Sequence, residues 1–300
     1  MSTLTSTFRA VSDWMSANLL ALNPSKTEFI LFGTPHQLSK LKNTSLALAS
    51  GTNITPSSSA RNLGFTFDTH LSYHNQISAL SKACFYHIWD LRHIRQYLSV
   101  SMAANIATSL VHSKLDYCNS LYLNLPQTEL NRLQHIQNAL ARVVTNTRLH
   151  DHITPSLQSL HWLKIHERIT YKVMSITYNV LNTSKPNYLS SLLSLQPARN
   201  TRSSRLVTLY PPAVTSSRAI LNRSFSYSAP RLWNSLPAKL RLPKCVDSPG
   251  LNLLSKSTFL TNLKTHLFTQ SYPNESRLIS SSSHNSTSNP THTIPPWPPD

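Results

Sequence analysis

Apolar residues recur every three to four positions through most of the chain, the spacing of one buried helical face. A first stripe over residues 4–20 stops at the Asn-Pro-Ser sequence of residues 23–25, which breaks helices. From residue 72 the helical period dominates. It predicts helices over residues 77–98, 99–111, 128–144, 165–180, 188–195 and 257–268. We therefore expect residues 70–195 to form a helical bundle.

Short apolar runs between the first stripe and the bundle are typical of β-strands. They cover residues 27–32, 45–49 and 62–67, and Gly64 inside the last suggests a bulge or a close backbone approach. Only residues 205–210 show a strand-like alternation later in the chain. The expected fold class is α+β and mainly α, with a small antiparallel sheet before the helices.

Composition changes along the chain predict its division into parts. Residues 1–69 hold the first helix and the strands, and residues 70–195 hold the bundle. Residues 196–270 are rich in Ser, Arg and Pro and form a basic extension. Residues 271–300 are rich in Ser, Asn, Thr and Pro, so we expect a disordered C-terminal tail.

The scarcity of glycine and of acidic residues excludes several enzyme classes. Four glycines in 300 residues, none near another, exclude glycine-rich phosphate-binding loops and the Gly-x-Ser-x-Gly turn of hydrolases. The eleven acidic residues are widely spaced, so no local carboxylate motif for two-metal chemistry exists.

Cysteine and histidine spacing gives no metal or disulfide motif. Cys84, Cys118 and Cys245 are far apart and odd in number, which favours small buried hydrophobic residues in a reducing compartment. Two histidine pairs have ligand-like spacing but no cysteine pair to complete a zinc site: His70 with His74, and His150 with His152. With no signal peptide or membrane-spanning run in sight, we expect a nuclear or cytoplasmic protein without a membrane partner.

Positive charge is the strongest chemical signal. The chain carries 28 Lys and Arg against 11 Asp and Glu, a net charge of +17, interleaved with aromatic residues. Such a balance favours contact with nucleic acid through phosphates and stacked bases. The candidates on the first bundle helix are Lys82, Arg92 and Arg95. The tryptophans are expected to be packing anchors rather than stacking platforms: Trp14, Trp89, Trp162 and Trp233.

Several motifs in order resemble one family, the reverse transcriptases of non-LTR (LINE-type) retrotransposons, in particular jockey-like and chicken-repeat-like elements. Residues 14–28 (WMSANLLALNPSKTE) resemble its "W…N.L.LN..KTE" segment, and residues 61–68 (RNLGFTFD) resemble its "RNLG..FD" primer-grip hairpin. The matching segments that follow are IRQYL at 94–98, KLDYCN at 114–119, LQHIQNA at 133–139, LHWL at 160–163, LWNSLP at 232–237 and LKTHLF at 263–268. The resemblance covers about residues 8–270.

This resemblance implies a partial palm over residues 1–69 and a thumb-like bundle over residues 70–195. The turn formed by Leu63, Gly64 and Phe65 would lie near a primer end, and Lys26 matches a position where a lysine assists the departure of pyrophosphate. The family's polymerase activity requires three aspartates that would lie before Met1, and this chain contains no Asp-Asp. We therefore expect no catalytic residue, no metal site and no cofactor here. Mg²⁺ is expected only for the full-length enzyme, whereas an RNA or DNA primer-template is the expected partner.

Two alternatives stay open beside a truncated nucleic-acid-binding protein. The chain is an incomplete gene model of an active reverse transcriptase, or it is a decayed element copy without selected function. Residues 246–251 depart from the family pattern and resemble a splice or frameshift scar.

Overall fold

The computed structural model describes residues 2–41, 44–47, 53–197, 206–211, 221–242 and 254–273. Helix accounts for 63% of these residues and strand for 7%, which confirms a mainly helical fold with small sheets. The chain divides into two compact units, residues 1–80 and 81–300, and the division falls within helix α3. The finer boundaries expected from composition stay predictions, and the expected tail lies almost wholly outside the described residues.

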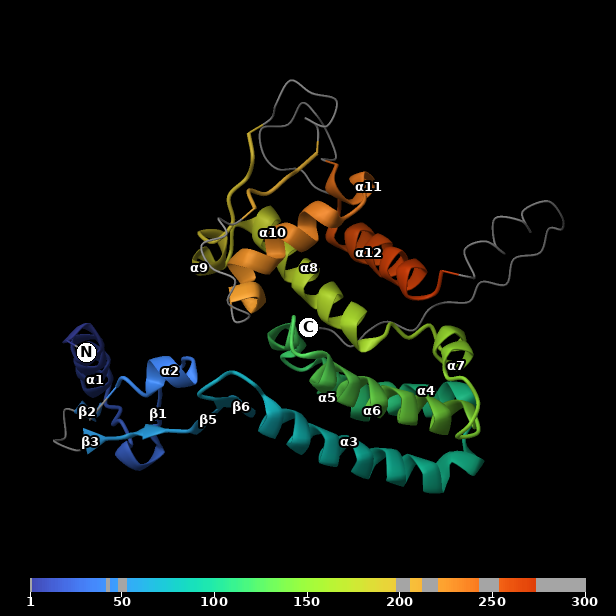
Figure 1. Cartoon of the computed structure of the whole chain (residues 1–300), viewed down its shortest axis with the longest axis horizontal. Helices are drawn as coiled ribbons and strands as arrows, with labels where there is room; N and C mark the ends of the chain where they lie inside the picture. The colour runs from blue at the N-terminus through green and yellow to red at the C-terminus, as the bar shows by residue number, and fades with distance from the viewer. Residues whose placement is uncertain are drawn as a thin grey trace. The chain divides into compact units, whose positions relative to one another are not determined.

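The N-terminal unit combines one long helix with very short strands (Figure 1). Its elements before α3 are α1 (Ser2–Ala17), η1 (Pro24–Lys26), β1 (Phe29–Ile30), α2 (Pro35–Leu38), β2 (Leu46–Ala47), β3 (Asn53–Ile54), β4 (Pro56–Ser57), β5 (Ser59–Asn62) and β6 (Phe65–Asp68). Among the described residues the strands form three two-stranded sheets, β1 with β4 in parallel and the pairs β2–β3 and β5–β6 antiparallel. No single sheet unites them.

The β5–β6 hairpin corrects the predicted strand over residues 62–67. Asn62 pairs with Phe65, so the two residues between them form the turn rather than a bulge inside one strand. Leu63 and Gly64 have φ angles of 47° and 82°, the left-handed conformation that a two-residue type I′ turn requires at both positions. An apolar run split by such a turn gives two strands where periodicity alone predicts one.

The second unit is built from helices around α6 and α8 (Figure 1). Its elements, from the helix that begins in the first unit onward, are α3 (His74–Ile94), η2 (Arg95–Tyr97), α4 (Val100–Ala107), the π-helical turn η3 (Thr108–His112), α5 (Ser113–Asp116), η4 (Asn119–Tyr122), α6 (Gln127–Thr145), α7 (Thr154–Ser159), α8 (Ile165–Thr183), α9 (Asn187–Ser190), η5 (Leu221–Arg223), α10 (Phe225–Ser235), α11 (Ala238–Arg241) and α12 (Lys256–Ser271). The described chain thus confirms a helical bundle over most of residues 70–195.

The core of the second unit follows the predicted stripes closely. The predicted apolar positions of α6 are buried, namely Leu130, Leu133, Ile136, Leu140, Val143 and Val144. Helices α10 and α12 pack against α8, where the Phe259 ring stacks on Tyr178 with centroids 4.4 Å apart and on Trp233 at 5.8 Å. Burial of such rings contributes several kilocalories per mole to folding.

Three predicted elements of the second unit differ from the structure. The helix predicted over residues 188–195 is limited to α9 (Asn187–Ser190). The apolar spacing of the helix after residue 99 predicts a buried face of Ile106, Leu110 and Val111, and of these only Val111 is buried. Leu110 is exposed, and Ala103 and Ala107 are buried in its place. Small alanines let α4 lie close to α6, and this close approach selects the alanine face over the leucine. The predicted strand over residues 205–210 is reduced, in its described part, to a single antiparallel bridge between Leu195 and Leu209.

Candidate nucleic-acid interface

The hairpin turn presents a leucine to solvent. Leu63 is 85% exposed at the tip, and a Cβ on Gly64 would meet no atom within 4 Å. Phe65 behaves differently, because its side chain is buried against the rings of Phe67 and Tyr73, with centroids 5.0 and 5.2 Å away. Of the three predicted turn residues, only Leu63 and Gly64 are therefore open to a ligand. The Phe65 ring is part of the core.

Asp68 holds the hairpin to the start of α3. Its carboxylate accepts hydrogen bonds from the backbone N–H groups of Ser72 (2.8 Å) and Tyr73 (2.7 Å). Partial burial raises the pKa of Asp68, but the hydrogen bonds from these two N–H groups, together with those from the Ser72 side chain and the His70 N–H, outweigh burial and leave the pKa below its ordinary value. A second link is the Thr66 N–H, which donates to the Gln76 side chain at 3.0 Å. The last residue of the RNLGFTFD motif thus has a structural role.

Lys26 lies at the end of η1, and its side chain is exposed. Its backbone N–H donates to the Asn23 carbonyl at 3.2 Å, and the Asn23 side chain accepts from Ser25. The Asn-Pro-Ser sequence therefore forms a compact turn, as its helix-breaking composition predicted, and Lys26 follows it with an exposed ammonium group.

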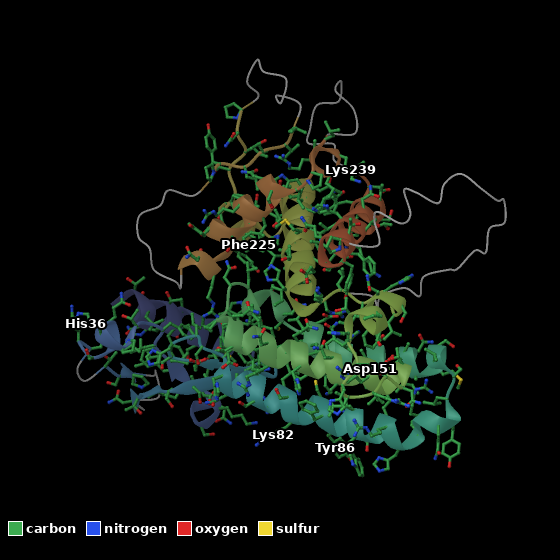
Figure 2. The ribbon with its side chains drawn as sticks, turned by 45° about the vertical axis from the view of Figure 1, so that its right-hand side comes forward. His36, Lys82, Tyr86, Asp151, Phe225 and Lys239 are labelled. Atoms are coloured by element: carbon green, nitrogen blue, oxygen red, sulfur yellow. The ribbon has the colours of Figure 1, made fainter. Side chains whose placement is uncertain are left out.

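Lys82 and Arg92 are exposed on α3. Within the described ranges neither side chain makes a hydrogen bond or an ion pair. They lie ten residues apart, about 2.8 helical turns, so their directions around the helix axis differ by about 80°. Figure 2 shows Lys82 on the side of α3 turned away from α6. These two cations are available to an anionic ligand.

Arg95, the third predicted cation, is committed to the protein itself. Its guanidinium donates to the carbonyls of Val143 and Val144 at the last turn of α6, at distances of 2.8 to 3.2 Å, and to the Leu98 carbonyl at 2.6 Å. The C-terminal carbonyls of a helix lack intrahelical donors and carry partial negative charge, so a cation there stabilises the helix end. Arg95 is thus a helix cap, and sequence spacing alone gave no signal of this.

A hollow of about 650 Å³ lies between the C-terminal ends of α3 and α6. It is lined by Arg92, His93, Arg95, Gln96, Arg142, Val143, Asn146, Thr147 and Leu149. Arg142 donates to the carbonyls of Arg148 and Asp151. Three guanidinium groups therefore border one concave surface, and no acidic side chain is among its lining residues.

The four tryptophans among the described residues divide into two pairs. Trp162 and Trp233 are buried, as predicted, and the Trp233 indole N–H donates to the Val207 carbonyl at 3.0 Å. The expectation is wrong for Trp14 and Trp89, which are 62% and 58% exposed. Trp14 lies on α1 and Trp89 on α3.

Sequence reasoning missed a buried polar network in the second unit. The Arg168 guanidinium pairs with both carboxylate oxygens of Asp116, one of them at 2.9 Å, and the Asn119 amide donates to Asp116 at 3.2 Å. Nearby, burial and then the charge of Arg168 hold the pKa of His112 well below its usual range. Residues 114–119 (KLDYCN) are one of the segments that carry the family resemblance, but nothing in this segment indicates which arginine its aspartate binds.

No cluster of three or more potential metal ligands occurs among the described residues. Burial raises the pKa of the Cys84 thiol to about 11, an effect that the Lys114 charge opposes. Cys84 is therefore a protonated core residue at neutral pH, as expected, whereas Cys118 is partly exposed and Cys245 lies outside the described residues.

In the ranges that the structure covers, no helix has both the length and the apolar character needed to cross a membrane. Searches of protein-family models, curated proteins and solved structures found no match to this chain.

Proposed function

We propose that this protein binds nucleic acid through its phosphate backbone without reading sequence, as the C-terminal part of a non-LTR retrotransposon reverse transcriptase. The family assignment rests on the ordered motifs between residues 8 and 270, and the binding rests on charge and exposure. Catalysis is not proposed, because the chain contains no Asp-Asp pair and no described cluster of carboxylates.

The observation that supports binding most directly is the state of Lys82 and Arg92. Both are exposed and without partners among the described residues, on a helix whose only acidic residue is Asp90. Exposed lysine and arginine side chains with few neighbouring carboxylates attract phosphates, and the release of condensed counterions drives their association. A net charge of +17 adds a long-range attraction that raises the rate of encounter.

The test is the salt dependence of binding to a mixed-sequence duplex of about 20 base pairs, a length sufficient for several phosphate contacts. We expect the logarithm of the binding constant to fall linearly with the logarithm of salt concentration. The double variant Lys82→Ala with Arg92→Ala should make this slope shallower by about two, since each lost phosphate contact reduces its magnitude by about 0.9. Arg95 is left intact because it caps α6.

The matched control removes the same charge elsewhere. Lys185, in the loop after α8, and Lys239, on α11, are both exposed, so their double alanine variant also lowers the net charge by two. We expect it to leave the slope within about half a unit of the wild type. Equal slopes for the two double variants would show that α3 is not the binding surface. The absence of salt-dependent binding would contradict the proposed function itself.

A further inference from the structure

Exposed aromatic rings gather on the outward face of α3 and the turn that follows it. Tyr86 and Trp89 are more than half exposed, and Tyr97 is 79% exposed. Figure 2 shows Tyr86 and Lys82 on the same side of the helix, away from α6. Contiguous exposed rings are uncommon on a protein surface and are typical of interaction sites. The opposite face of the same helix is buried, so α3 is packed normally and the exposure is specific to this side.

Trp89 is held by its neighbour one turn later. The His93 ring lies 4.0 Å from the Trp89 ring, centroid to centroid, and its Nδ1 donates to the Trp89 carbonyl at 2.8 Å. A side chain restrained in this way loses less conformational entropy when a second ring binds to it. Trp89 is thus a partly ordered aromatic surface before any ligand arrives.

Cations lie at both ends of this aromatic face. Lys82 precedes Tyr86 by one turn, and Arg92 follows Trp89 by nearly one turn. Arg92 and His93 also line the hollow beside the C-terminal end of α6, together with Arg142. The aromatic face and the cationic hollow are therefore continuous. An anion bound in the hollow would lie beside an aromatic ring of the ligand that is stacked on Trp89.

We propose that this face binds an unpaired segment of nucleic acid, with a base stacked on Trp89 and a phosphate in the hollow at Arg92. The proposal rests on the proposed function and specifies its ligand. Bases in a duplex are covered on both faces by their neighbours, so only unpaired bases can stack on a side chain. Positive charge at both ends of the face, against the single carboxylate of Asp90, favours a polyanion over a protein partner.

The experiment compares the full chain with its Trp89→Ala variant by fluorescence anisotropy. The probes are a labelled oligo-dT of about 20 nucleotides and a labelled duplex of equal length, both longer than a typical single-strand site. We expect Trp89→Ala to weaken oligo-dT binding by about tenfold, as removal of one stacking platform does, and duplex binding by less than about twofold. Trp14→Ala is the matched control, because it removes an equally exposed tryptophan from α1. Trp14→Ala should change the affinity for neither oligo-dT nor the duplex.

Two further variants separate stacking from folding and from apolar contact. Trp89→Phe keeps a ring and should retain most of the affinity for oligo-dT, whereas Trp89→Leu keeps apolar area without a ring and should lose it. Wild-type affinity in Trp89→Leu, or equal behaviour of Trp89→Ala and Trp14→Ala, overturns the proposal and points to an apolar protein partner for this face. In those cases the proposed function still stands if the Lys82 and Arg92 double variant lowers the salt slope on duplex.

Discussion

The two units of the chain differ in how completely they bury their own apolar faces. Helix α1 has an amphipathic stripe, yet none of its described side chains is buried, and Leu4, Val11 and Trp14 are exposed. Helix α6 in the second unit is only three residues longer and buries eight side chains. A pattern of apolar positions therefore predicts a helix in both units, but it produces a core only where other elements supply the opposite surface.

The strands of the N-terminal unit show the same shortage. Four of its six described strands contain two residues, and its ring cluster is limited to the hairpin with Phe32 and Tyr73. Isolated two-stranded pairs are marginally stable in water. The second unit instead joins several long helices through buried rings and a buried ion pair. We infer that the second unit sets the stability of the chain, and the predictions below test this difference.

The largest effect is expected from the buried ion pair of the second unit. Arg168→Ala removes the ion-pair partner of the Asp116 carboxylate, which keeps only the Asn119 amide of the two donors described above. The Arg168 side chain is 3% exposed and the Asp116 side chain 26%. Breaking such a pair should lower the free energy of unfolding by about 3 kcal/mol, measured by urea denaturation. Hydrogen exchange should show the loss in α5, α6 and α8, while amide protection in the hairpin stays unchanged.

The control for this variant is a second arginine–carboxylate pair in the same unit. Arg132 pairs with Glu129 at 2.7 Å but is 35% exposed, so Arg132→Ala should cost less than about 0.5 kcal/mol. Loss of hairpin protection in parallel with α8 would show instead that the chain unfolds as one cooperative unit, and the distinction between the units would be wrong.

A smaller effect is expected at Arg95. Arg95→Ala removes the guanidinium donors from the Val143 and Val144 carbonyls and leaves Val143 only the long hydrogen bond from the Asn146 N–H at 3.4 Å. This loss should destabilise the second unit by about 2 kcal/mol and increase hydrogen exchange at the end of α6. Arg95→Lys should not restore stability, because a lysine cannot reproduce the planar set of donors. Arg92→Ala, three residues away, should weaken nucleic-acid binding without a measurable change in stability. The reverse result, normal stability and weak binding in Arg95→Ala, would make Arg95 a ligand contact.

The helices of the second unit were the most predictable part of the fold. In α6 and α12 the apolar spacing predicted both the helix and the residues that it buries, and the structure confirms both. The hairpin was expected from the resemblance of residues 61–68 to a hairpin motif, and apolar spacing alone missed it. Its turn contains a leucine with positive φ where sequence rules expect glycine or asparagine. The face predicted for the helix after residue 99 is right at Val111 and wrong at Leu110, because packing against α6 buries Ala103 and Ala107 instead.

The candidate site was predictable in charge and not in geometry. Composition indicated a cationic surface, and Lys82 and Arg92 are indeed exposed. Spacing could not show that Arg95 binds carbonyls from a helix 48 residues further along the chain, since such contacts depend on tertiary packing. Trp89 is a different case, because it falls outside the apolar stripe of its helix, in which Ile88 and Leu91 are buried. Its exposure could have been predicted from spacing, and the expectation of a packing anchor rested on the size of the side chain alone.

The smallest expected effect lies in the N-terminal unit, at Asp68. Its pKa is lowered in the folded chain, so its stabilising contribution is complete above the ordinary carboxyl range near 3.8 and is lost as pH falls through the folded pKa. Hydrogen exchange of the Phe65–Asp68 amides between about pH 6 and pH 3 should show the hairpin losing protection near the acid end. In Asp68→Asn this acid-dependent step should disappear, because an amide can accept the Ser72 and Tyr73 N–H groups but does not titrate. A hairpin equally protected across that range in both proteins would mean that the three-ring packing of Phe65, Phe67 and Tyr73 suffices without the carboxylate, and the N-terminal unit would then be more self-sufficient than its thin core indicates.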